Sequence, residues 1–240
     1  FSVGDEVWYA GDITRPGCNT THQLIDSRIV AHKPKLLNWG EAAAIPLTAL
    51  TAWEGLFERL KIQEANSDKT LLIIGGAGGV GSLAIPLAAL RSKVRIIATA
   101  SRPESAKWCL ERGADLTVDY RNLQNNLLEH GIKQVDYIFC LNDTDGHWKA
   151  MSDIIAPFGH ICSIVENKGP LEQSLIRSKS VAMHWELMFT RSMYQTPDIA
   201  EQGNILAQTA KLIDDGELKT TLNETLHGLS VESITQAHQK

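Results

Sequence analysis

The chain has 240 residues, of which 43% are hydrophobic and 21% are charged, and its formal net charge at neutral pH is −5. This length and composition suit one large or two moderate globular domains and exclude a disordered or fibrous protein. A net negative charge without a long basic run argues against a nucleic-acid partner, because binding to a phosphate backbone needs a basic face.

Cysteine usage and targeting motifs indicate a reducing compartment. The four cysteines have neither CxxC nor zinc-finger spacing, so we expect reduced, mostly buried thiols at Cys18, Cys109, Cys140 and Cys162. Residues 70–90 carry no charge, but their five glycines and Pro86 fit a strand, a turn and a helix better than a membrane span. Without a signal peptide or a lipidation motif, the sequence predicts a cytoplasmic protein with no membrane partner.

The N-terminal part of the chain favours β structure. It opens on "FSVGDEVWYAG" without a methionine and looks truncated. Two β-type segments, 7–10 and 24–30, are separated by glycines and a proline, which predicts antiparallel strands. From Leu47 to Leu60, apolar residues recur at helical spacing and predict one amphipathic helix.

Beyond this helix the pattern predicts an alternation of strands and helices. Six apolar runs have the length of strands, and helix-length stretches separate them: 71–74, 94–98, 116–118, 135–140, 160–165 and 181–187. The runs do not alternate with polar residues, which is typical of parallel strands covered by helices on both faces. We therefore predict an α/β fold with a Rossmann-type doubly wound parallel sheet, followed by helices at 197–215 and 231–238.

Five glycines lie between positions 75 and 81, and Gly76, Gly78 and Gly81 satisfy G-x-G-x-x-G. The cluster follows an apolar strand and opens a helix, which is the context in which this pattern binds a dinucleotide. A side chain at Gly78 would hold a pyrophosphate off the turn, and one at Gly81 would push the helix off the strand. We predict a pyrophosphate loop made of Gly76, Ala77, Gly78, Gly79, Val80 and Gly81. A tight turn without ligand and a methyltransferase-type nucleotide site remain alternatives.

The end of the next strand predicts which dinucleotide binds. NAD sites place an acidic residue about 20 residues beyond the glycines, where it binds the ribose hydroxyls. Here Ala100 stands at that position and is followed by Ser101 and Arg102. A hydroxyl and a guanidinium can bind a ribose 2′-phosphate, whereas a carboxylate would repel it. The sequence therefore predicts NADPH over NADH, with Arg102 as a solvated loop cation the alternative.

Seven segments of the chain form a recognisable set: "VGDEVWYAG", "EAAAIPLTALTAWEGLFERL", "LLIIGGAGGVGS", "IIATASRPES", "RGADLTVDY", "APFGHICSI" and "HWELMFTRSMYQTPD". In them the chain resembles the medium-chain dehydrogenase/reductase superfamily, and most closely its quinone-oxidoreductase-like branch, often labelled zinc-type alcohol dehydrogenase-like. The resemblance implies a GroES-like β-rich catalytic domain, of which 1–45 are a remnant, an NADP(H)-binding Rossmann domain over 46–190, and a helix and return segment over 191–240. Relative to that plan the chain lacks an N-terminal part and the final strand, so by itself it can be inactive.

The resemblance also extends the cofactor site. It implies contacts from Ser101 and Arg102 to the 2′-phosphate, from Tyr120 to that phosphate or the adenosine, and from Thr51 near the nicotinamide. Three further candidates follow the fourth and fifth strands at the carboxyl edge, where ligands bind in open α/β sheets: Leu141, Ile164 and Glu166. For each of these residues an ordinary core, boundary or loop role stays open.

Zinc-dependent relatives place a cysteine ligand near the segment that corresponds to "AIPLTALTAW", where this chain has neither cysteine nor histidine. A catalytic zinc needs three protein ligands, so we predict no metal. Without a Lewis acid, hydride transfer suits acceptors that are already electrophilic.

The sequence thus predicts a zinc-independent, NADPH-dependent reductase of quinones or α,β-unsaturated carbonyls, with no strong acid or base in this chain. Two alternatives stay open: a non-catalytic, redox-sensing NADPH-binding module, and a zinc alcohol dehydrogenase without its metal lobe. By analogy with relatives, we expect a homodimer that pairs the sixth strand.

Overall fold

The computed structural model describes residues 1–239, which form two compact units. One unit is Thr48–Met188, and the other combines Phe1–Leu47 with the chain from Phe189 onward. Across the described residues, no helix has both the length and the apolar character needed to cross a membrane.

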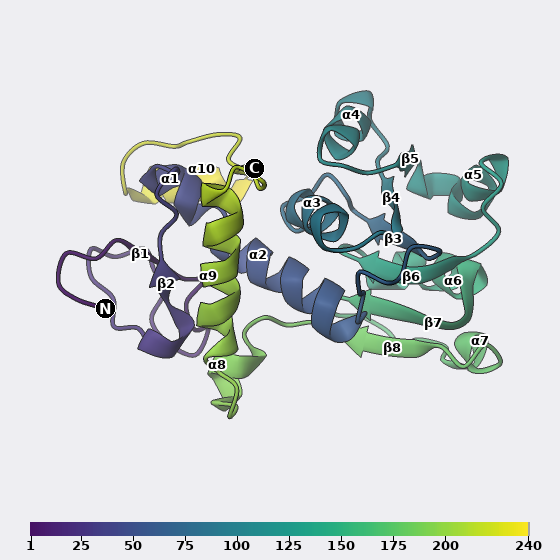
Figure 1. Ribbon diagram of the computed structural model, residues 1–240, viewed down its shortest axis with the longest axis horizontal. Coiled ribbons are helices and arrows are strands. Elements are labelled where there is room, and N and C mark those ends of the chain that lie inside the picture. Colours follow the sequence, from purple (N-terminus) through teal and green to yellow (C-terminus); the bar gives the residue numbers. More distant parts are fainter. Residues whose placement is uncertain (240) are drawn as a thin grey trace. The chain divides into compact units, whose positions relative to one another are not determined.

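The unit over Thr48–Met188 is built on a parallel sheet of six strands in the order β5-β4-β3-β6-β7-β8 (Figure 1). The strands are β3 (Thr70–Ile74), β4 (Arg95–Thr99), β5 (Leu116–Val118), β6 (Val135–Cys140), β7 (Ile155–Ser163) and β8 (Ala182–Trp185). Four consecutive residues of β3, from Leu71 to Ile74, are fully buried, which explains why this run is continuously apolar. The predicted doubly wound sheet is confirmed.

Helices cover both faces of this sheet (Figure 1). A buried cluster packs one face against α5 (Leu123–Glu129), α6 (Thr144–Ile154) and the short α7 (Ser174–Arg177). The opposite face is covered by α3 (Gly81–Arg91) and α4 (Pro103–Glu111). The chain leaves β3 towards β4 and β5 on one side and returns at β6 on the other. The crevice at the carboxyl ends of β3 and β6 is therefore the topological switch point, where open α/β sheets bind ligands.

The helix predicted over 47–60 changes type along its length. An α-helix, α2, spans Pro46–Trp53, and the chain continues as a π-helical segment, Glu54–Arg59. Gly55 in this segment lies against β6, because a Cβ there would stand 2.3 Å from the Phe139 ring. Such close packing leaves no space for a side chain at position 55.

Two predicted strands have other bounds in the structure. The run predicted over 160–165 belongs to β7, which begins earlier, at Ile155, and ends at Ser163. The sixth strand, β8, ends at Trp185, before the predicted residue 187.

The other unit contains little β structure. Strand β1 (Val7–Trp8) pairs antiparallel with β2 (Ala31–His32). The predicted strand over 24–30 is wrong: a 3₁₀ turn, Ser27–Ile29, occupies it, because the Asp26 carboxylate accepts a hydrogen bond from the backbone N–H of Arg28. The helices of this unit are α1 (Trp39–Ala43), α8 (Thr190–Tyr194), α9 (Glu201–Asp214) and α10 (Val231–Gln239).

Candidate functional site

The turn after β3 is fixed by the end of the neighbouring strand. Gly75 has φ +86, in the left-handed region that favours glycine. Its backbone N–H donates a hydrogen bond of 3.0 Å to the Oγ1 of Thr99, the last residue of β4. The turn therefore starts in one defined conformation at the switch point of the sheet.

Two of the motif glycines allow close packing beneath the turn. A Cβ at Gly76 would stand 2.7 Å from the Cβ of Ala98 and 3.2 Å from the Cys109 Sγ. A Cβ at Gly81 would stand 2.4 Å from the carbonyl oxygen of Gly76, so that the first residue of α3 touches the turn itself. Gly78 is different, because it is exposed. A Cβ at Gly78 would stand 3.3 Å from its nearest neighbour, the carbonyl oxygen of Gly75. The turn thus has a packed inner side and a bare outer side.

A cavity of about 420 Å³ lies on the bare side of the turn. Its lining comes from the carboxyl ends of β3, β4, β5 and β6 and the residues that follow them: Gly75, Ala77, Gly78, Gly79, Val80, Gly81, Thr99, Ala100, Ser101, Arg102, Ser105, Tyr120, Leu141 and Asn142. Among these described lining residues, Arg102 is the one with a charged side chain. The cavity therefore presents backbone, hydroxyl and guanidinium groups, a set suited to an anion.

The structure brings most of the predicted cofactor residues to this cavity. These are Ala77, Gly78, Gly79, Val80, Gly81, Ser101, Arg102, Tyr120 and Leu141. Gly76 does not line it but lies buried directly beneath the turn. The cavity also contains residues that the sequence analysis did not assign to the site, namely Gly75, Thr99, Ala100, Ser105 and Asn142. Ser105 lies in the first turn of α4, whose N-cap residue is Arg102.

Three predicted residues do not line the cavity. Thr51 is buried on α2. Ile164 is half-buried after β7, and its backbone N–H donates to the carbonyl oxygen of Cys140 at 3.2 Å. Glu166 lies in the same connection and is exposed. Their assignment to the cofactor site stays a prediction.

The thiol beneath the turn is a packing group. Cys109 on α4 is completely buried, and burial raises the pKa of its thiol to about 11. At neutral pH the side chain is therefore a neutral thiol below Gly76. This position offers no thiolate to the cavity above it.

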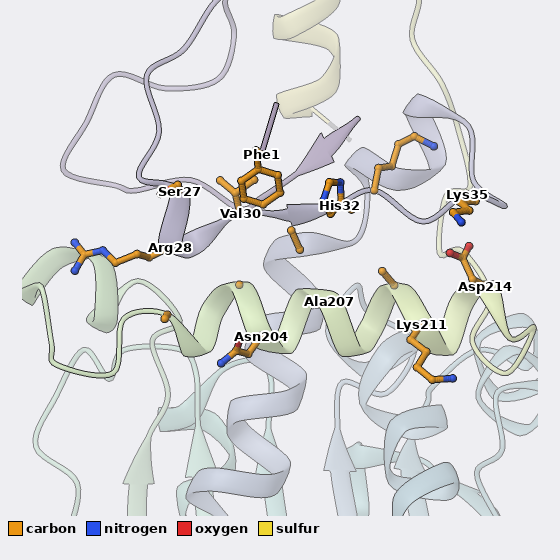
Figure 2. A pocket seen from close by; sticks show the side chains of 15 residues that line it. Phe1, Ser27, Arg28, Val30, His32, Lys35, Asn204, Ala207, Lys211 and Asp214 are labelled. Atoms are coloured by element: carbon orange, nitrogen blue, oxygen red, sulfur yellow. The ribbon is translucent and has the colours of Figure 1, made fainter. Parts of the chain in front are cut away.

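A second cavity, of about 590 Å³, belongs to the other unit. Figure 2 shows α9 along one wall and the segment with Val30 and His32 along the other. Several polar groups at its rim have partners: Arg28 contacts Asp26, and the backbone N–H of Leu36 donates to the Asp214 carboxylate at 3.0 Å. The α9 wall combines small residues, Gly203, Ala207 and Ala210, with the polar side chains of Asn204, Lys211 and Asp214.

A parallel six-stranded sheet with a glycine turn and an anion-suited cavity at its switch point defines a dinucleotide-binding fold of the medium-chain dehydrogenase/reductase type. The model of the zinc-binding dehydrogenase family matches residues 112–240, more than half of the chain. Over its whole length the chain is 40% identical to a zinc-type alcohol dehydrogenase-like protein of Staphylococcus aureus (strain MSSA476), of which it covers 72%. The chain therefore belongs to the zinc-binding dehydrogenase family, and the predicted superfamily is confirmed.

Two further similarities are informative. A crystal structure of a protein of the zinc-dependent alcohol dehydrogenase type from Rhizobium etli CFN 42 has a TM-score of 0.94 and 43% identity, with 100% of this chain and 70% of that chain covered. The 2-methylene-furan-3-one reductase of Solanum lycopersicum is 39% identical over 125 residues, which is 49% of this chain and 31% of that protein. The family is thus one of oxidoreductases.

The family name implies zinc, and the donor set of this chain can be tested against it. Within residues 1–239, no group of three or more histidine, cysteine, aspartate or glutamate side chains is placed to hold a metal ion. A catalytic zinc site needs three such ligands. The described residues therefore do not fit a zinc site, and we derive no step through a metal.

Proposed function

We propose that this chain carries the NADP(H) site of an oxidoreductase that transfers a hydride to a quinone or an α,β-unsaturated carbonyl compound. The observation that carries the proposal is the cavity of about 420 Å³ over a bare glycine turn, with Ser101, Arg102 and Ser105 in its wall and no carboxylate among its described lining residues. A dinucleotide with a 2′-phosphate matches this arrangement better than one with a free 2′-hydroxyl, which NAD sites bind through an acidic residue.

Different lining residues suit different parts of the proposed NADP(H) ligand. The outer side of the turn, with Gly78 at its surface, and the N-terminus of α3 suit the pyrophosphate, because the positive end of a helix dipole attracts an anion. Ser101 and Arg102 suit the 2′-phosphate, and Ser105 adds a hydroxyl beside them. Tyr120 suits the adenosine. For the nicotinamide end, Thr51, Ile164 and Glu166 stay candidates.

The chemistry available in the described residues supports the proposed acceptor class. A bound nicotinamide cofactor supplies two electrons as a hydride, and a proton from solvent completes the reduction of the acceptor, so that a quinone becomes a hydroquinone and an enone a saturated ketone. Since the described residues do not form a metal site that would polarise a simple carbonyl, we favour acceptors whose own conjugation delocalises the added charge. The similarity to 2-methylene-furan-3-one reductase, named for a substrate of this class, supports this choice.

The assembly and the location of the protein are further parts of this proposal. We infer a homodimer in which β8, the edge strand of the sheet, pairs with its copy, because an uncovered edge offers free backbone groups. We place the protein in the cytoplasm, where its three buried free thiols, Cys109, Cys140 and Cys162, stay reduced.

The test is NADPH oxidation by the full-length protein, followed by absorbance, with a panel of quinones, enals and enones and with a simple ketone as the unactivated control. We expect turnover with the conjugated acceptors and little with the simple ketone. Tight NADPH binding without turnover of any acceptor would instead support a redox-sensing module.

A zinc alcohol dehydrogenase is the rival that the family name favours. Metal analysis of the same full-length protein decides this point. Stoichiometric zinc together with NADP⁺-dependent oxidation of simple alcohols would replace the proposed acceptor class.

A further inference from the structure

Tyr120 lines the cofactor cavity, and 42% of its surface is accessible. Its backbone is well held: it opens a 3₁₀ turn whose N-cap, Asp119, accepts a hydrogen bond from the Arg121 N–H at 2.9 Å. The Asn126 amide also donates to the Asp119 carbonyl oxygen at 2.7 Å. These contacts fix the backbone of Tyr120 but leave its ring free to rotate about the side-chain bonds.

One contact to the ring comes from α6. The imidazole of His147 lies perpendicular to the Tyr120 ring, with an interplanar angle of 84° and a centroid separation of 5.7 Å. This geometry is the edge-to-face arrangement that aromatic pairs prefer. The two residues are 27 positions apart, and they meet because α5 and α6 pack on the same face of the sheet.

His147 is itself held in place. Only 8% of its surface is accessible, and its neighbour Trp148 packs into the core cluster on this face. The first turn of α6 is fixed by Asp143, whose carboxylate accepts from the Gly146 N–H at 3.1 Å. Burial lowers the pKa of His147, so the ring is neutral at neutral pH. The imidazole does not line the cavity and can act on a ligand only through Tyr120.

We propose that His147 is a positioning residue of the cofactor site: it holds the Tyr120 ring against the adenosine end of the cavity. This inference rests on the proposed function. A side chain that must be immobilised when a ligand binds weakens affinity, and a ring that is already held avoids this loss. His147 therefore strengthens binding of any ligand that carries the adenosine 2′-phosphate end, without touching it.

The test measures binding of NADPH and of adenosine 2′,5′-bisphosphate by calorimetry to wild type, His147→Leu and His147→Phe. We expect His147→Leu to weaken both ligands by about three- to tenfold, the range measured for aromatic pairs. His147→Phe, which keeps an aromatic edge, restores most of the affinity. Lys149→Ala, an exposed position on α6 two residues after His147, is the matched control and leaves both affinities unchanged.

A double-variant cycle separates positioning from general damage to the fold. If His147 acts through Tyr120, then His147→Leu has no further effect on affinity in a Tyr120→Ala background. Equal losses in both backgrounds, or wild-type affinity in His147→Leu, would overturn the inference while the proposed function stands. Failure of the wild-type protein to bind NADPH at all would overturn the proposed function and this inference with it.

Discussion

The first residue of α3, Gly81, touches the carbonyl group of Gly76, so that a Cβ at position 81 would stand 2.4 Å from the Gly76 oxygen and 2.6 Å from its carbon. Both atoms are backbone and cannot move aside like the end of a flexible side chain. The contact sets how closely the helix N-terminus approaches the turn after β3. The position of the backbone N–H groups at the cavity therefore depends on it.

Gly81→Ala is expected to destabilise the protein by about 1–3 kcal/mol, since overpacking against backbone forces the helix away from the strand. The same shift should weaken NADPH binding. Urea unfolding and calorimetry measure the two effects. Gly169→Ala is the matched control, because the nearest atom to a Cβ there is 4.0 Å away. Equal stability of the two variants would contradict the packing role of Gly81.

Arg102→Ala is expected to weaken NADPH binding by about tenfold or more and to leave NADH binding nearly unchanged, because a charge-assisted contact to a 2′-phosphate exists for NADPH alone. Lys107→Ala is the control. The Lys107 side chain on α4 is 78% exposed, and its removal should change the affinity for neither NADPH nor NADH. Equal losses of affinity for NADPH and NADH in Arg102→Ala would show that the guanidinium does not bind the 2′-phosphate.

The ammonium group of Lys179 caps the carboxyl end of α6. It donates to the carbonyl oxygens of Ser152, Asp153 and Ile155 at 2.8, 2.8 and 2.9 Å. Lys179→Met should destabilise the protein by about 1–3 kcal/mol, since partly buried carbonyl groups lose their donor. Lys149→Met on the exposed side of α6 should change the unfolding free energy by less than about 1 kcal/mol. A Lys179 variant as stable as the control would be inconsistent with this role.

The neighbouring strands β7 and β8 carry a hydrogen-bonded imidazole pair, with 3.1 Å between His160 Nδ1 and His184 Nε2. Burial lowers the pKa of both residues below the usual 6.5, and the charge of Lys61 adds to this effect. As the pH falls below about 6.5, the unfolded chain therefore takes up protons before the folded chain does. The stability from this pair is present above that pH and is lost as the pH falls through the lower folded values.

Urea midpoints at roughly pH 7.5 and pH 5.5 measure this loss. The double variant His160→Gln/His184→Gln should lose less stability between the two pH values than the wild type does. It keeps some dependence, because burial also lowers the pKa of His147. A wild-type slope that is unchanged in the double variant would rule out the pair as its source.

The sheet could be predicted from the sequence because its central strands, β3 and β6, are buried on both faces. Continuous apolar runs such as 71–74 and 137–140 leave little choice of structure. The strand at 24–30 was predicted wrongly because Asp26 offers the backbone a local hydrogen bond that competes with strand pairing. Apolar content alone does not reveal such a competition.

The candidate site was predictable where function depends on a local motif. The residues of the glycine turn follow one another in the sequence, as do Ser101 and Arg102, and both segments line the same cavity. Thr99 and Asn142 were missed because their places in the site depend on strand order, which brings the ends of β4 and β6 to either side of β3. Ser105 was missed although it lies three residues after Arg102, in the first turn of α4. The contact between Tyr120 and His147 depends on the packing of α6, so no spacing rule could reveal it.

The central claim is that the cavity over the glycine turn selects a dinucleotide with a 2′-phosphate. Calorimetric titration of the wild-type protein with NADPH and with NADH under the same salt conditions tests it most directly. The account predicts that NADPH binds at least about tenfold more tightly, the contribution expected from one charge-assisted contact. Equal affinities, or tighter binding of NADH, would contradict it.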